Sequence, residues 1–191
     1  GQVAKNFIKK LIIEKYNIVL TVTSRNKTSK ETFNGVKYNN YLFNSDEFDS
    51  NLLVKLKEAD HILVSIPPEK EKDLVVKNFS KFIEDSKVKW ITYLSATSVY
   101  GDHKGEWVHE GSEAKPTSPN GIARLKAENS WLSLQMKKKL SVQIFRLAGI
   151  YSNEKNILAR LKSGTVKHIV KNDHYFSRIH VDDIANILFK S

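Results

Sequence analysis

The chain contains no cysteine among its 191 residues. A disulfide framework, a thiolate metal site and a cysteine nucleophile are therefore all excluded. No apolar run approaches the roughly 20 residues that a membrane span needs, and the first residues show no signal-peptide pattern. We accordingly expect no membrane association. Because the lack of cysteine favours no compartment, the cytoplasm is the default expectation.

Arginine is also scarce. The formal net charge is +10, yet only five of the 31 lysines and arginines are arginine, and the lysines are scattered along the chain. Arginine is the usual residue for base and phosphate recognition, and no basic helix interleaved with aromatic residues is present. The positive charge alone would allow a nucleic-acid partner, but the scarcity of arginine and the scatter of the lysines argue against one. Attraction of small anionic ligands stays open.

Short apolar segments alternate with segments of helical periodicity. A polar break, SRNKTSKET, is expected at 24–32, and a hairpin-like segment at 167–181. The pattern predicts strands at 18–23, 36–43, 61–65, 88–95 and 141–148, and helices at 3–14, 49–59, 74–83, 121–138 and 156–161 and from Asp182 onward.

This alternation predicts an α/β fold, a doubly wound, Rossmann-like parallel sheet with helices on both faces. Its ligand crevice should lie at the carboxyl ends of the strands. We expect a dinucleotide-binding domain at 1–150. Residues 151–191 should form the start of a small substrate-binding lobe plus a returning helix, not an independent domain. Because the chain opens on a helix, the first strand is expected upstream of Gly1.

The first four residues, GQVA, fit the last four positions of the dinucleotide fingerprint G-x-G-x-x-G/A. A glycine at Gly1 would let the backbone approach a pyrophosphate at the helix N-terminus, and the small Ala4 would allow close packing. Alone this match is weak, and an arbitrary helix start fits it too. The strand and turn that follow support Gly1, Gln2, Val3 and Ala4 as cofactor-binding residues.

The turn after residues 18–23 bears on the choice of dinucleotide. An NAD site commonly has a carboxylate there, but this chain has Ser24 and Arg25, with no carboxylate before Glu31. Arginine and serine suit a 2′-phosphate, so NADP is favoured and NAD remains possible. The alternative is a solvated basic turn without a ligand.

Four stretches of the second half, in this order, resemble one family. They are WITYLSATSVYGDH, PTSPNGIARLKAE, IFRLAGIY and RIHVDDIA. The series resembles the extended short-chain dehydrogenase/reductase superfamily, of the NAD(P)-dependent epimerase/dehydratase type. The resemblance implies the doubly wound fold, NAD or NADP as cofactor and a small-molecule substrate, such as a nucleotide sugar or another carbonyl or hydroxyl compound. It also allows for a homodimer.

The family's active site combines a Ser or Thr near the end of the fifth strand with Tyr-x-x-x-Lys on the next helix. In this chain those positions hold Ala96, Asn120 and Arg124. Asparagine has no titratable proton and arginine stays protonated, so neither can serve as the general acid/base. The chain therefore resembles the atypical members of the superfamily, which keep the cofactor site and lose the catalytic residues.

A replacement acid/base could come from the loop over the expected cleft, where Thr97, Tyr100 and His103 are weak candidates. A solvated glycine-rich loop is the alternative. The spacing of His103, Glu106 and His109 is not that of a helical H-E-x-x-H motif, so no metal site is expected.

The resemblance also implies cofactor contacts at strand ends and on the helix that carries the replaced lysine. Two hypotheses remain open. The protein is an NAD(P)-binding oxidoreductase- or epimerase-like enzyme with an atypical active site, or it is a non-catalytic NADP-binding module with a redox-sensing or regulatory role. The implied contacts are Asn44, Ser65, Ile66, Pro67, Arg124, Leu147 and Ala148.

Overall fold

A computed structural model describes the chain from Gly1 to Ser191, except residues 70–71, 139, 167–174 and 176. The helices are α1 (Gln2–Ile13), α2 (Asn51–Glu58), α3 (Leu74–Glu84), α4 (Pro119–Lys138), α5 (Ile157–Lys162) and α6 (Val181–Lys190), with a short 3₁₀ turn η1 (Thr97–Val99). The strands are β1 (Thr21–Ser24), β2 (Ser29–Phe33), β3 (Val36–Leu42), β4 (His61–Val64), β5 (Trp90–Ala96), β6 (Val142–Leu147), β7 (Gly149–Tyr151) and β8 (Arg178–His180).

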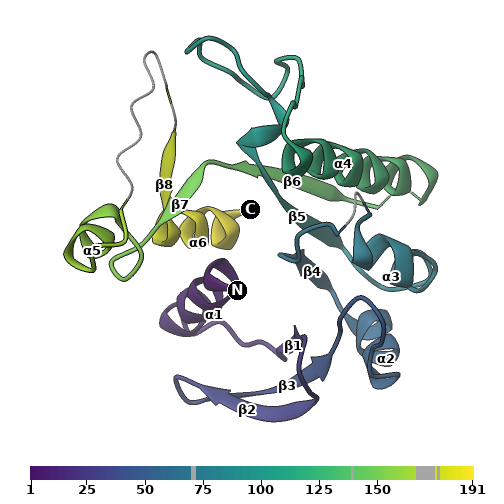
Figure 1. Ribbon diagram of the computed structural model, residues 1–191. Coiled ribbons are helices and arrows are strands. Elements are labelled where there is room, and N and C mark those ends of the chain that lie inside the picture. Colours follow the sequence, from purple (N-terminus) through teal and green to yellow (C-terminus); the bar gives the residue numbers. More distant parts are fainter. Residues whose placement is uncertain (70–71, 139, 167–174, 176) are drawn as a thin grey trace.

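Parallel strands form the centre of the molecule (Figure 1). One sheet has the order β4-β5-β6, with all strands parallel. A second has the order β1-β3-β2, in which β1 runs parallel to β3 and β2 runs antiparallel to it. A third pairs β7 with β8 in parallel. The predicted α/β fold with a Rossmann-like parallel sheet is confirmed.

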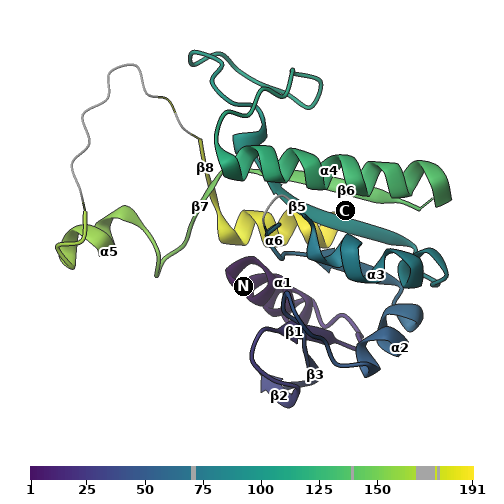
Figure 2. The same ribbon diagram turned by 45° about the vertical axis from the view of Figure 1, so that its right-hand side comes forward.

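Two apolar clusters cover the two faces of β5, because adjacent residues of a strand point to opposite faces. On one face Tyr93 packs with α2, α3 and α4, with Trp131 of α4 fully buried. On the other face Leu94 packs with Val3 of α1 and Ile184 of α6. Figure 1 shows this layering, with α3 and α4 on one side of β4 and β5 and α1 and α6 on the other, and Figure 2 shows α4 running along β6.

The last helix belongs to this core. The apolar side of α6 packs against α1. The ring of Phe189 packs edge-on against the ring of Tyr16, with 6.1 Å between the two ring centroids. The residues after β6 therefore return to the face on which the chain began. None of the helices in the described residues is both long and apolar enough to cross a membrane.

The predicted polar break at 24–32 is wrong in its second half, because Ser29–Phe33 forms β2. This strand pairs with β3 across a turn in which Asn34 and Gly35 both have positive φ, 46° and 82°. A two-residue Asn-Gly turn is a strong hairpin signal, since both residues tolerate that conformation.

A further expectation needs correction. The strand predicted at 18–23 begins only at Thr21, and Val19 is almost fully exposed. The hairpin-like segment expected at 167–181 falls mostly outside the described residues. Within its described part, β8 pairs in parallel with β7.

Candidate dinucleotide site

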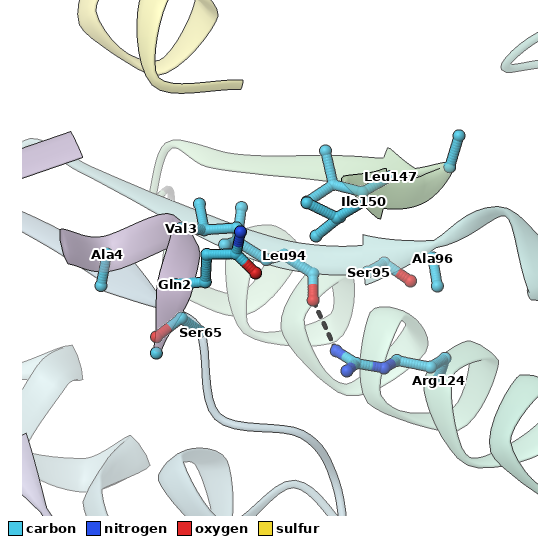
Figure 3. A pocket seen from close by; sticks show the side chains of 12 residues that line it. Gln2, Val3, Ala4, Ser65, Leu94, Ser95, Ala96, Arg124, Leu147 and Ile150 are labelled. Carbon is cyan, nitrogen blue, oxygen red and sulfur yellow. Dashed lines mark hydrogen bonds between the residues drawn. The ribbon is translucent and has the colours of Figure 1, made fainter. Parts of the chain in front are cut away.

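A pocket of about 250 Å³ lies at the carboxyl ends of β4, β5 and β6, beside the first turn of α1 (Figure 3). This is where an open parallel sheet binds its ligands. The volume is below the usual range for a whole ligand, so the pocket suits one part of a larger molecule. Its lining residues are Gly1, Gln2, Val3, Ala4, Ser65, Leu94, Ser95, Ala96, Arg124, Leu147, Ala148 and Ile150.

The first turn of α1 provides hydrogen-bond donors to the pocket. Gly1 occupies the N-cap and has no side chain that could cap the helix. The amides of the first turn therefore lack a capping partner, and the helix dipole adds positive potential at this end. A Cβ placed on Gly1 would meet none of the described atoms within 4 Å. Such a helix end suits a phosphate group.

Arg124 reaches the pocket from α4. Its Nη1 donates to the carbonyl oxygen of Leu94 at 2.5 Å and lies 3.4 Å from the hydroxyl of Tyr93. Figure 3 shows the guanidinium held below β5 by the first of these bonds. Burial raises the pKa of Tyr93 to about 12, although the charge of Arg124 and its hydrogen bond act in the opposite direction. The neutral phenol therefore adds a second fixed partner to the guanidinium.

Ser95 carries an unpartnered hydroxyl at the pocket. The residue is only 4% exposed, and its Oγ has no hydrogen-bond partner among the described residues. A buried polar atom without a partner is unfavourable, and natural structures satisfy nearly all of them. A ligand group in the pocket is the natural partner for this hydroxyl. The orphaned Ser95, the open amides of α1 and the fixed Arg124 together fit a phosphate-containing cofactor.

The three positions of the replaced triad lie in different environments. Ala96 and Arg124 line the pocket, whereas Asn120 is exposed on the first turn of α4 and does not. Next to it, Gly121 packs so tightly that an added Cβ would lie 2.5 Å from the carbonyl oxygen of Ser98. Among the described lining residues, Arg124 is the one ionisable side chain, so the pocket wall contains no carboxyl, phenol or imidazole.

Two of the candidates for a replacement acid/base, Tyr100 and His103, make contacts that hold their own loop in place. The Nε2 of His103 lies 3.2 Å and 3.1 Å from the carbonyl oxygens of Tyr100 and Glu113. The ring of Tyr100 is buried under the guanidinium of Arg146, 4.8 Å from its carbon. Thr97 opens the 3₁₀ turn. None of Thr97, Tyr100 and His103 belongs to the lining of the pocket.

Arg146 forms a buried ion pair that the sequence did not reveal. It contacts Glu128 of α4 through Nε and Nη2, with Nη2 at 2.8 Å from Oε2, and Glu128 is 1% exposed. The hydrogen bonding with Glu128 raises the pKa of Arg146. Because Arg146 stands opposite Ser95 on the neighbouring strand, the pair joins α4 to β6 beside the pocket.

The turn after β1 lies outside the pocket but near it. The pKa of the Gly1 amino group is lowered, first by burial, then by the charge of Lys5 and then by the charge of Arg25. Because its charge acts on Gly1, Arg25 is close to the first turn of α1. Ser24 is held within the turn, where its Oγ donates to the carbonyl of Lys27 at 3.2 Å.

Other predicted contacts shape the surroundings. Asn44 accepts from the amides of Asp46 and Glu47 and donates to the carbonyl of Arg25 at 3.4 Å, so it fixes the turn. Ile66 and Pro67 follow β4 just beyond the lining residue Ser65.

Sequence analysis did not single out Leu94, Ser95 or Ile150 as lining residues. Ser95 could have been found, because it adjoins the Ser/Thr position of the motif. Among the described residues, no group of three or more His, Asp or Glu side chains could hold a metal ion.

Comparisons with known proteins give similarity at the level of structure only. No family model and no curated protein matches the sequence. A conserved protein of unknown function from Silicibacter pomeroyi is 30% identical, with a TM-score of 0.79 over 99% of this chain and 64% of its own. This chain thus spans less than two thirds of that protein.

Structures with assigned activities are more distant. A UDP-N-acetylglucosamine 4-epimerase from Methanobrevibacter ruminantium, solved with UDP-N-acetylmuramic acid, is 15% identical, with a TM-score of 0.75 over 96% of this chain and 67% of its own. A dTDP-glucose 4,6-dehydratase from Streptomyces venezuelae, solved with NAD, is 16% identical, with a TM-score of 0.73 over 98% and 69%.

The chain has the fold of the NAD-dependent epimerases and dehydratases. The resemblance stated from its four motif stretches is thereby confirmed for the fold.

Proposed function

We propose that the protein binds a nicotinamide dinucleotide, with the pyrophosphate at the N-terminus of α1 and the nicotinamide half in the pocket beside Arg124. The observation that supports this most strongly is the convergence of three features on one pocket. These are the uncapped amides of α1, the fixed Arg124 and the unpartnered hydroxyl of Ser95. A pyrophosphate, a polar carboxamide and sugar hydroxyls would use all three.

NADP is the proposed form of the cofactor. From the α1 N-terminus the adenosine half would run toward the turn after β1, where Arg25 is exposed and lies near Gly1. Asn40 supports this turn, because its Nδ2 donates to the Oγ of Ser24 at 2.9 Å. A guanidinium on an ordered turn suits a 2′-phosphate, and charge-assisted hydrogen bonds of this kind are among the strongest.

Ligand binding is better supported than acid–base turnover. A bound nicotinamide would supply hydride chemistry. The side chains that line the pocket, however, include none that could give or take a proton, because Asn120 is exposed and Arg124 stays charged. We therefore propose a protein on the epimerase/dehydratase scaffold that keeps the dinucleotide site and has lost the usual proton donor. A nucleotide sugar is the second candidate ligand, because the distantly related epimerase was solved with UDP-N-acetylmuramic acid.

The test is a calorimetric titration of the protein with NADPH and with NADH. We expect NADPH to bind more tightly by about tenfold, since Arg25 contacts a phosphate that NADH lacks. The variant Arg25→Gln should bring NADPH affinity down to that of NADH. Lys30→Gln removes the same charge from exposed strand β2 and should leave the preference intact. Absence of binding by both dinucleotides would overturn the proposed function.

A further inference from the structure

Arg124 is the one ionisable side chain among the described residues that line the pocket, and it cannot swing away easily. Its Nη1 is held by the carbonyl of Leu94 at 2.5 Å, and the hydroxyl of Tyr93 lies 3.4 Å away. Its guanidinium carbon also lies 5.9 Å from the centre of the Tyr93 ring. A positive charge is therefore fixed at the end of the pocket opposite the first turn of α1.

The two redox forms of a nicotinamide dinucleotide differ in charge at one ring. The oxidised ring carries a positive charge, whereas the reduced ring is neutral. We propose that Arg124 makes this pocket selective for the reduced dinucleotide, so that occupancy follows the reduced fraction of the pool. This inference rests on the proposed function, because it requires that the nicotinamide half occupy this pocket.

Selectivity also requires that no free carboxylate in the pocket compensate the oxidised ring. Among the described residues, Asp73 is a carboxylate on which the charge of Arg124 acts, and it is 6% exposed. Its Oδ1 accepts from the amides of Val75 and Val76, and its Oδ2 accepts from the indole of Trp131 at 3.2 Å. The carboxylate of Asp73 therefore caps the N-terminus of α3, and Asp73 does not line the pocket.

The carboxylate of Glu128, which is also near Arg124, is held in an ion pair. Glu128 lies one helical turn beyond Arg124 on α4, and Arg146 binds it through two nitrogens. The Ser95 hydroxyl is uncharged and would serve both redox forms equally, so it adds affinity without discrimination. Discrimination therefore depends on Arg124. Two like charges in a half-buried pocket repel enough to weaken binding of the oxidised form by about tenfold.

The experiment measures the ratio of dissociation constants for NADP⁺ and NADPH by calorimetry. The wild-type protein should bind NADPH about tenfold more tightly. Arg124→Gln removes the charge and should bring the ratio close to one, mainly by strengthening the binding of NADP⁺. Arg124→Lys keeps a positive charge and should keep most of the preference. Lys137→Gln removes a charge from an exposed site on the same helix and should leave the ratio unchanged.

The outcomes separate this inference from the proposed function. If neither dinucleotide binds, the proposed function fails and the inference fails with it. If both bind with equal affinity, or if the ratio in Arg124→Gln equals that of the wild type, the site stands and selectivity by Arg124 is overturned. Because Arg124→Gln could fold poorly, Arg124→Lys supplies a second decision. If Arg124→Lys, which keeps the positive charge, lost the preference for NADPH over NADP⁺, the role of the charge would be overturned.

Discussion

Tyr93 of β5 is fully buried against α4, and its hydroxyl lies 3.4 Å from Nη1 of Arg124. Burial raises its pKa from 10.0 to about 12. The native state therefore keeps the phenolic proton at a pH where the unfolded chain has lost it. The contribution to stability is complete below pH 10 and disappears as the pH rises from 10 to 12.

We accordingly expect the free energy of unfolding to fall more steeply with pH above 10 in the wild type than in Tyr93→Phe. Urea denaturation at successive pH values measures this slope. Tyr16→Phe, at an exposed tyrosine, is the matched control and should follow the wild type. If Tyr93→Phe shows the same slope as the wild type, Tyr93 does not keep its proton in the native state.

At single positions, sequence reasoning was most successful where a backbone motif was involved. The first turn of α1 was proposed from the dinucleotide fingerprint and Ser65, Arg124, Leu147 and Ala148 from the family resemblance, and the structure brings them to one pocket. Their roles as cofactor contacts stay predictions. Ser95 was not predicted as a lining residue, because the feature that distinguishes it is a buried hydroxyl without a hydrogen-bond partner among the described residues. That property depends on the packing of α4 against β5 and cannot be read from spacing.

At the scale of elements, the buried helices and strands were predictable and the exposed strand was not. The apolar periodicity of α1, α3 and β5 results from burial, so the sequence records it directly. Strand β2, by contrast, has the sequence SKETF and is mostly exposed at a sheet edge. Strand propensity is weak for its lysine and glutamate, although its last two residues, Thr32 and Phe33, favour strands. Only the Asn34-Gly35 turn indicated the hairpin.

The position of α4 relative to the pocket depends on close contact at its first turn. A Cβ on Gly121 would lie 2.5 Å from the carbonyl oxygen of Ser98 and 2.9 Å from the Cβ of Pro116. Alanine is the better helix former by about 1 kcal/mol. Since the clash is with backbone, we expect it to outweigh that gain.

Gly121→Ala should therefore lower the free energy of unfolding by about 1–3 kcal/mol. It should also weaken NADPH binding, because α4 carries Arg124. Ser133→Ala, on the exposed side of the same helix, should change stability by less than about 0.5 kcal/mol. Urea denaturation and calorimetry check both effects. A variant Gly121→Ala that is as stable as the wild type would show that α4 can shift without cost.

At the scale of the whole molecule, the first and last helices share one cluster. Val3 of α1, Leu94 of β5 and Ile184 of α6 pack together, with Ile184 fully buried. Val3 and Leu94 also line the pocket. The last helix, which the sequence predicts as a helix returning to the first part of the chain, therefore supports the pocket from behind.

The packing predicts that α6 unfolds together with the rest of the core. Ile184→Ala should lower the free energy of unfolding of the whole chain by about 2–5 kcal/mol, because it leaves a cavity in the shared cluster. Circular dichroism should report one common transition with the fluorescence of Trp131, which lies in the opposite cluster. The other two tryptophans, Trp90 and Trp107, are replaced by phenylalanine in every protein compared, so that the emission comes from Trp131 alone. Ile187→Ala, 48% exposed on the same helix, should cost far less. If Ile184→Ala melts α6 while the Trp131 signal keeps its wild-type midpoint, the last helix is an independent unit and the pocket does not depend on it.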